Sequence, residues 1–207
     1  MIGITGAHRC GKTTLAKTIA GTSGVYYLES KVSDTFSRLG YDPRQDYSFD
    51  DRLYVQFQIL YDMERTYQQA PTSDFITDRT PIDVYAYLLA DVQRTTLSAV
   101  QEDDLERFWK EVSRITSTHF DLVMVIQPGI ELIEAVGKAP AAPGYVEHIN
   151  AIIIGLVMGK AYQDLDSNVI LMKREITDLR ERSNVALTYA KEYFPNHIFL
   201  QDSCPLM

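Results

Sequence analysis

The sequence predicts an α/β fold with one five-stranded, mostly parallel sheet that carries helices on both faces. The first observation is length, because 207 residues correspond to a single domain. The second is a series of short apolar runs with strand character, and the third is that stretches of helical period separate them. Strands joined through helices pair in parallel by right-handed crossovers, so ligands are expected at the carboxyl ends of the strands.

Each expected strand is a short buried run rich in β-branched and other large apolar residues. These runs cover residues 2–5, 25–28, 75–77, 122–126 and 169–172. Apolar residues at helical spacing predict helices between and after them. The expected helices cover residues 13–20, 32–39, 51–69, 83–89, 103–115, 145–162 and 176–193.

The composition limits the classes of function. A formal charge of −8 opposes a broad nucleic-acid footprint and favours small ligands held in a local cationic pocket. The longest apolar-looking stretch, residues 151–158, is far shorter than the ~20 residues that span a bilayer. The amino terminus shows no signal-peptide pattern, so we expect a cytoplasmic protein. The only cysteines, Cys10 and Cys204, are expected to be reduced.

The strongest motif is a phosphate-binding loop that follows the first strand and opens the first helix. It fits the pattern Gly-x4-Gly-Lys-Thr. Its glycines allow backbone N–H groups to surround a phosphate, and the helix points its positive dipole end at the same anion. We therefore expect ATP to bind at Gly6, Ala7, His8, Arg9, Cys10, Gly11, Lys12, Thr13 and Thr14.

Two residues of this loop have expected roles in phosphoryl transfer. Lys12 neutralises charge at the β-γ bridge, and the Thr13 hydroxyl completes the shell of Mg²⁺. The alternative is a chance glycine-rich turn. Arg9 either touches a phosphate or faces solvent, and Cys10 is either a thiol of lowered pKa or a small filler residue.

A second polar element follows the expected strand at residues 75–77. Asp78 stands at the carboxyl end of this strand, where it is suited to hold Mg²⁺ through water or through Thr13. Arg79 is suited to clamp an acceptor or the transferring phosphate with its planar guanidinium. The alternative is that Asp78 caps the next helix and pairs with Arg79. These two residues join Lys12 as candidate catalytic residues.

With the phosphate loop and the run Asp78-Arg79-Thr80-Pro81-x-Asp83, the chain resembles the nucleoside and nucleotide kinases. Thymidylate kinases and deoxynucleoside kinases carry a similar acidic-Arg element, and phage-type nucleotide kinases and nicotinamide riboside kinases are related. The resemblance implies a P-loop kinase-like three-layer sandwich, with residues 1–207 as a single domain. It also implies that ATP and Mg²⁺ are the cofactors.

The resemblance extends to the acceptor side, which we place in the region of residues 29–70. Glu29 resembles the glutamate of deoxynucleoside kinases that acts as base on the acceptor hydroxyl. A strand-end Glu that caps the following helix is the alternative. Gln58 resembles the glutamine with which these kinases read the base. Glu29 is therefore both a catalytic and an acceptor-binding candidate, and Arg79 and Gln58 are acceptor-binding candidates.

The stretch 129–148 is a candidate lid, although a plain surface connection is the other reading of this irregular segment. It departs from the family pattern because it holds no arginine. Lys138 is then the acceptor-side cation of the lid, or Arg174, Arg180 or Arg182 reaches in.

The leading functional hypothesis is an ATP-dependent phosphotransferase that acts on a nucleotide or nucleoside-type acceptor. Three alternatives stay open: a phage kinase that phosphorylates 5-hydroxymethyluracil in DNA, an ATPase switch or binding module, and an enzyme like nicotinamide riboside kinase. DNA is not the favoured acceptor because the chain is acidic. No membrane partner is expected, a homodimer is left open, and a phage-encoded protein would act in the host cytoplasm.

Overall fold

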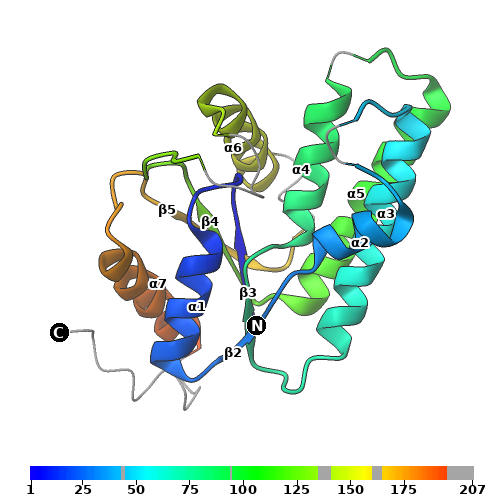
Figure 1. Ribbon diagram of the computed structural model, residues 1–207. Coiled ribbons are helices and arrows are strands. Elements are labelled where there is room, and N and C mark those ends of the chain that lie inside the picture. Colours follow the sequence, from blue (N-terminus) through cyan, green and yellow to red (C-terminus); the bar gives the residue numbers. More distant parts are fainter. Residues whose placement is uncertain (43–44, 94, 135–140, 160–164, 195–207) are drawn as a thin grey trace.

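The computed structural model describes residues 1–42, 45–93, 95–134, 141–159 and 165–194 (Figure 1). Within these residues, the strands form one sheet in the order β2-β3-β1-β4-β5. Every pair in this sheet is parallel, which confirms the expected α/β class. The strands are β1 (Ile2–Thr5), β2 (Tyr26–Leu28), β3 (Phe75–Thr77), β4 (Leu122–Ile126) and β5 (Asn168–Met172).

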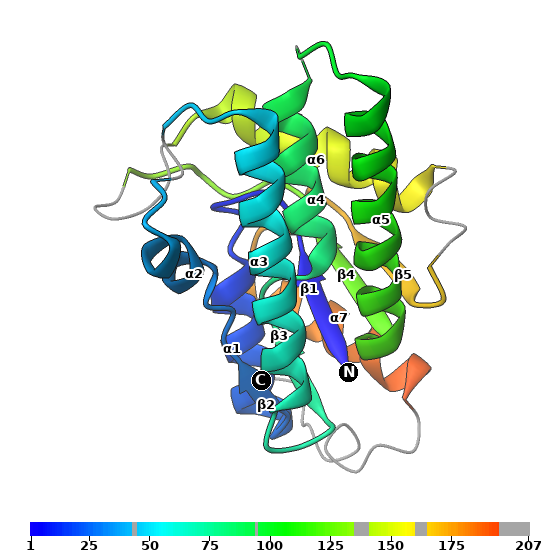
Figure 2. The same ribbon diagram turned by 90° about the vertical axis from the view of Figure 1, so that its right-hand side faces the viewer.

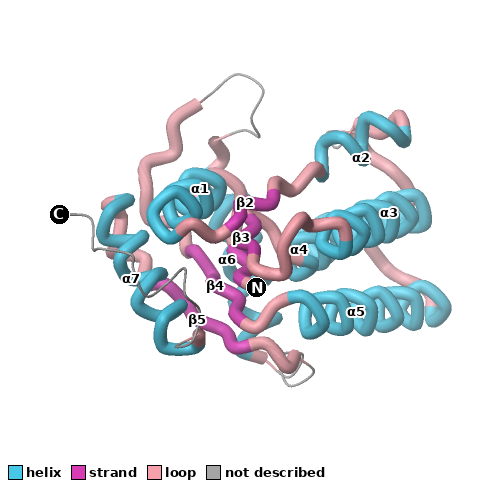
Figure 3. Tube along the Cα trace, turned by 90° about the horizontal axis from the view of Figure 1, so that it is seen from below, coloured by secondary structure: helices cyan, strands magenta, loops and turns pink. Residues whose placement is uncertain are grey.

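The helices form two layers around the sheet. Figure 3 shows α1 and α7 on one side of the strands and α3, α4 and α5 on the other. In Figure 2, α3, α4 and α5 lie side by side, while α2 packs on α3 and α6 packs on α4. The helices are α1 (Lys12–Ser23), α2 (Val32–Leu39), α3 (Phe49–Gln68), α4 (Pro81–Val92), α5 (Ala99–His119), α6 (Pro143–Met158) and α7 (Leu179–Tyr193).

The core explains why the strands were visible as unbroken apolar runs. β1 is buried at all four residues and β4 at all five, since helices cover both faces of a parallel sheet. β1 is central, with β3 and β4 as its neighbours. The loop after β1 therefore lies between the loops that follow β3 and β4, at the edge where ligands of such sheets bind.

The expected strand ranges agree with the structure to within one residue, whereas several helices begin earlier or later than expected. Ser48 caps α3, because its side chain accepts a hydrogen bond from the Asp51 backbone N–H. A capping box between Ser98 and Gln101 starts α5 at Ala99. Asp178 caps α7, which delays this helix from residue 176 to residue 179. Helix capping, which apolar periodicity does not report, fixed these ends.

Among the described helices, none combines the length and apolar character needed to cross a lipid bilayer.

A substitution at Gly129 tests how closely the loop after β4 approaches the loop after β5. A Cβ atom at this position would lie 2.2 Å from the backbone oxygen of Arg174, in the loop after β5. We expect Gly129→Ala to lower the free energy of unfolding by about 1–3 kcal/mol, because backbone must move. Gly155→Ala is the control, since a Cβ there meets nothing within 4 Å. Its expected effect is zero or a gain of up to about 1 kcal/mol. Urea unfolding of both variants measures the difference, and equal stability would contradict the close approach.

Candidate functional site

The loop between β1 and α1 has a backbone that only particular residues tolerate. Gly6 has a φ of 151°, and a Cβ there would lie 2.3 Å from the backbone oxygen of Ile126. Gly11 has a φ of 81° and precedes the first residue of α1. Arg9 also has a positive φ, at 62°. Both glycines of the motif are thus required by conformation, and the one at residue 6 also by space.

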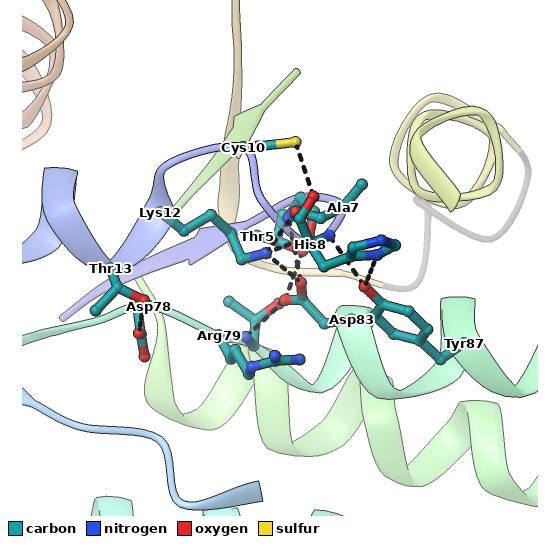
Figure 4. A network of polar contacts seen from close by, with 12 residues as sticks. Thr5, Ala7, His8, Cys10, Lys12, Thr13, Asp78, Arg79, Asp83 and Tyr87 are labelled. Atoms are coloured by element: carbon teal, nitrogen blue, oxygen red, sulfur yellow. Dashed lines mark hydrogen bonds and ion pairs between the residues drawn. The ribbon is translucent and has the colours of Figure 1, made fainter. Parts of the chain in front are cut away.

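Lys12 is folded back into the loop rather than extended toward solvent (Figure 4). Its Nζ donates to the backbone oxygens of Gly6 at 2.5 Å and Ala7 at 2.8 Å. The same atom lies 3.7 Å from Asp83 Oδ1. Burial lowers the pKa of Lys12, Asp83 opposes that change, and the positive charge of Arg79 lowers the pKa further. The ammonium group is therefore held inside the loop by internal partners.

Asp83, in the first turn of α4, joins this helix to the end of β1. Its carboxylate accepts hydrogen bonds from the Thr5 hydroxyl at 2.8 Å and the Gly6 N–H at 3.2 Å. It also accepts the Thr80 N–H at 2.9 Å, which completes a capping box. Only 1% of Asp83 is exposed. The capping box could have been found in the sequence, because Thr80-Pro81-Ile82-Asp83 fits its pattern. The contacts of Asp83 with the phosphate loop were not predicted.

Tyr87 lies one helical turn after Asp83 and contacts His8, in the next part of the phosphate loop. Its hydroxyl accepts the backbone N–H of His8 at 3.0 Å and lies 3.0 Å from Nδ1 of the same histidine. The His8 ring also stacks at a tilt against Tyr145 of α6, with centroids 5.6 Å apart. Burial raises the pKa of Tyr87 well above its usual range. The first half of the loop is thus fixed by α4, and the N–H groups of the first turn of α1 remain for an anion.

Asp78 follows β3 and faces the start of α1. The Thr13 hydroxyl donates to one of its carboxylate oxygens, and the Ser30 N–H lies 3.4 Å from the other. Asp78 is buried. Thr80 and not Asp78 is the N-cap of α4, so the helix-capping alternative for Asp78 is wrong. A hydroxyl and a carboxylate therefore lie side by side at the mouth of the phosphate loop.

Arg79 is half-buried and close enough to Lys12 and Tyr87 to lower the pKa of both. Among the described residues, its guanidinium has no hydrogen-bond or ion-pair partner, so the alternative in which it pairs with Asp78 is not found. Its backbone oxygen accepts the Tyr67 hydroxyl at 3.4 Å. A cation of this kind beside a buried lysine is suited to an anionic ligand.

On the acceptor side, Glu29 is exposed at the end of β2 and lines a pocket of about 310 Å³. The pocket lies between α2 and the second half of α3, and its walls include Lys31, Arg38, Asp62 and Met63. Gln58 is half-buried on α3 but is not part of the lining. Of the two residues that the resemblance assigned to the acceptor site, Glu29 lines this pocket and Gln58 does not.

Two of the other expected cations, Arg9 and Arg174, have partners within the protein. Arg9 donates to the backbone oxygen of Ile133 and lies 3.5 Å from Glu134. Arg174 forms a two-point ion pair with Glu147 of α6. Lys138 falls outside the described residues, as do the other residues 135–140 of the candidate lid 129–148. The lid range also includes the first turns of α6, so part of it is regular helix.

Cys10 is buried inside the loop, and its thiol lies 3.7 Å from the backbone oxygen of His8. Burial raises the pKa of this thiol, although the charges of Lys12 and Arg182 act in the opposite direction. The direction of this shift favours the interpretation of Cys10 as a small filler residue over that of a thiol with a lowered pKa.

Comparison with known proteins places this geometry in a family. Residues 1–182 match the family described as AAA domain. The chain belongs to this AAA domain family. No curated protein matches the sequence of this family member. Its fold is similar to that of deoxyadenosine kinase from M. mycoides with bound dATP, at a TM-score of 0.67 and 17% identity. That alignment covers 92% of this chain and 98% of the kinase.

Two further solved structures resemble this AAA domain protein. NadR in complex with NAD and AMP-PNP aligns at a TM-score of 0.59 and 16% identity, over 95% of this chain and 50% of NadR. YorR from Bacillus subtilis, in complex with phosphorylated GDP, aligns at 0.52 and 11%, over 95% of this chain and 99% of YorR. At these identities the likeness establishes the fold. The expected P-loop kinase-like sandwich is confirmed.

Asp83 offers a test of how the loop is held. We expect Asp83→Asn to lower the free energy of unfolding by about 3 kcal/mol, since it leaves the buried Lys12 ammonium without its nearest carboxylate. The control is Asp103→Asn on the exposed face of α5, where a change within about 0.5 kcal/mol is expected. Guanidinium unfolding monitored by circular dichroism measures both. An Asp83→Asn protein as stable as the control would show that the carboxylate is not needed to hold the loop.

Proposed function

We propose that the protein transfers the γ-phosphate of ATP to a nucleoside- or nucleotide-type acceptor. One observation carries this proposal: Lys12, the Thr13–Asp78 contact and the guanidinium of Arg79, which pairs with no described residue, gather near the amino terminus of α1. The protein as a whole is acidic, with a formal charge of −8, so this local gathering of cations suits a polyphosphate. The fold likeness to deoxyadenosine kinase supports the same assignment.

In the proposed reaction, the first-turn N–H groups of α1 bind the phosphates of the donor. The Lys12 ammonium leaves the backbone oxygens of Gly6 and Ala7 and moves to the β-γ bridge, where negative charge grows during transfer. Arg79 draws the transferring group toward the acceptor and stabilises its charge.

Mg²⁺ fits the pair formed by Thr13 and Asp78. Hydroxyl and carboxylate oxygens are hard ligands of the kind that this ion takes, together with phosphate oxygens and water. We assign Thr13 and Asp78 to hold it, with the present hydrogen bond between them giving way. When bound, the ion would neutralise charge on the phosphates of the donor.

The acceptor is assigned to the pocket beside Glu29. Its volume of about 310 Å³ falls at the lower end of small-molecule sites and suits a nucleoside better than a duplex. Glu29 is exposed there, and no described residue pairs with its carboxylate, so it is available to take a proton from an acceptor hydroxyl. The region of residues 29–70 and the candidate lid 129–148 belong to this proposal.

A single panel of acceptors tests the proposal against its alternatives. The protein is incubated with ATP, Mg²⁺ and, in turn, nucleosides, nucleoside monophosphates, nicotinamide riboside and DNA containing hydroxymethyluracil, and products are identified by mass spectrometry. Nicotinamide riboside is included because the NadR neighbour was solved with NAD and AMP-PNP. Phosphate transfer to a free nucleoside or nucleotide supports the proposal. Hydrolysis that no acceptor changes would favour an ATPase switch, and transfer only to DNA would favour a DNA kinase.

Lys12→Met is expected to lower kcat by about 10²–10³-fold, because the side chain keeps its length but loses the charge that stabilises transfer. Lys17→Met on the same helix is the control, since Lys17 is exposed and its Nζ lies over the Tyr27 ring. Because Lys12 makes buried contacts with the loop, some loss of stability is also expected, so kcat is measured at a temperature where both variants are folded. Wild-type turnover by Lys12→Met would remove this lysine from the mechanism.

Glu29→Gln separates a hydroxyl acceptor from a phosphate acceptor. With a hydroxyl acceptor, the variant should lose about 10²–10⁴-fold in kcat, because no carboxylate takes the proton. With a phosphate acceptor, the rate should stay near that of the wild type. The control is Asp34→Asn, which removes another exposed carboxylate from the same pocket. If a hydroxyl is phosphorylated equally fast by wild type and Glu29→Gln, then Glu29 is not the base.

A further inference from the structure

Arg182 is a buried cation to which the proposed reaction assigns no role. It stands in the first turn of α7, where only 3% of it is exposed. Its Nε donates to the backbone oxygen of Ile176 at 2.6 Å, and one terminal nitrogen donates to the backbone oxygen of Cys10 at 2.8 Å. Within the described part of the chain, no carboxylate forms an ion pair with it. Burial lowers its pKa, as expected for a desolvated cation.

Arg182 lies directly against the phosphate loop. A Cβ atom at Gly11 would lie 3.5 Å from its terminal nitrogen, and this glycine is the residue from which α1 begins. The charge of Arg182 also acts on the Cys10 thiol, together with that of Lys12. The guanidinium thus connects the middle of the phosphate loop to the loop between β5 and α7.

This arrangement is electrostatically unfavourable in the absence of an anion. The amino terminus of α1 carries a positive partial charge, and Lys12 adds a full one nearby. A third positive charge, buried and paired only with two carbonyl groups, costs free energy that a carboxylate would normally offset. Arg114 and Arg174 show the ordinary solution, since each forms a two-point pair with a glutamate.

We propose that Arg182 is a positioning residue for the polyphosphate of the donor. Its guanidinium acts through the backbone of the phosphate loop, adds positive charge next to the loop and fixes the middle of the loop. This inference rests on the proposed function, because it is the donor phosphate that compensates the buried charge. Arg182 makes no contact with the acceptor pocket, so it acts on donor binding and leaves the chemical step nearly unchanged.

The test compares Arg182→Gln with Arg182→Lys. The first removes the charge, and the second keeps the charge but loses the two-point bridge. Calorimetry gives the Kd of ATP with Mg²⁺, and steady-state kinetics gives KM for ATP and kcat with whichever acceptor the panel identifies. Arg107→Gln is the control for the loss of one positive charge, because Arg107 is 69% exposed on α5 and pairs only with Asp104 among the described residues.

We expect Arg182→Gln to raise the Kd and KM for ATP about tenfold, which corresponds to about 1.4 kcal/mol, with kcat within about twofold of the wild type. Arg182→Lys should restore the Kd to within about threefold, and Arg107→Gln should match the wild type. A purely structural role would lower the melting temperature without ATP in both Arg182 variants and leave their Kd values equal to that of the wild type.

Two results overturn the inference alone: wild-type affinity in Arg182→Gln, or an Arg182→Lys protein that binds as weakly as Arg182→Gln. If Arg182→Gln does not fold, Arg182→Met, which also removes the charge but keeps a long unbranched side chain, takes its place with the same thresholds. Failure of the wild type to bind ATP would overturn the inference and the proposed function together, and the wild-type titration distinguishes that case.

Discussion

The carboxylate of Asp83 is the interaction on which the phosphate loop depends. It receives donors from the last residue of β1, from the first glycine of the loop and from the cap of α4, and it lies near the Lys12 ammonium. One buried group therefore ties a strand, a loop and a helix. Because all three elements meet at the carboxyl edge of the sheet, fixing this point also fixes where the edge presents N–H groups and cations.

The fold was readable from the sequence because its main signals are local. Buried parallel strands appear as continuous apolar runs, and Gly-x4-Gly-Lys-Thr has a meaning only between a strand and a helix. The strand order was not predicted, since it depends on contacts between residues far apart in the chain. The helix ends deviated from expectation where a side chain caps the backbone, as at Ser98 and Asp178.

Much of the candidate site lay beyond sequence reasoning, because it depends on residues far apart in the chain. The contact of Arg182 with the phosphate loop joins residues 172 positions apart. The inward fold of Lys12 depends on backbone oxygens whose direction is set by the conformation of Gly6. Gln58 and Glu29 were grouped by resemblance, yet only Glu29 lines the pocket. The sequence motifs identified candidate residues such as Lys12 and Asp78, but they did not indicate which side chains and backbone groups those residues contact.

The inward position of Lys12 has a consequence for how firmly the proposed donor nucleotide would be retained. Because the Lys12 ammonium has three oxygen partners inside the loop, a phosphate that binds it replaces those contacts, and only the difference contributes to affinity. The same oxygens are ready to receive the ammonium again once a phosphate has been lost. In the proposed reaction, release of the spent nucleotide would thereby be eased, which favours repeated turnover over tight storage.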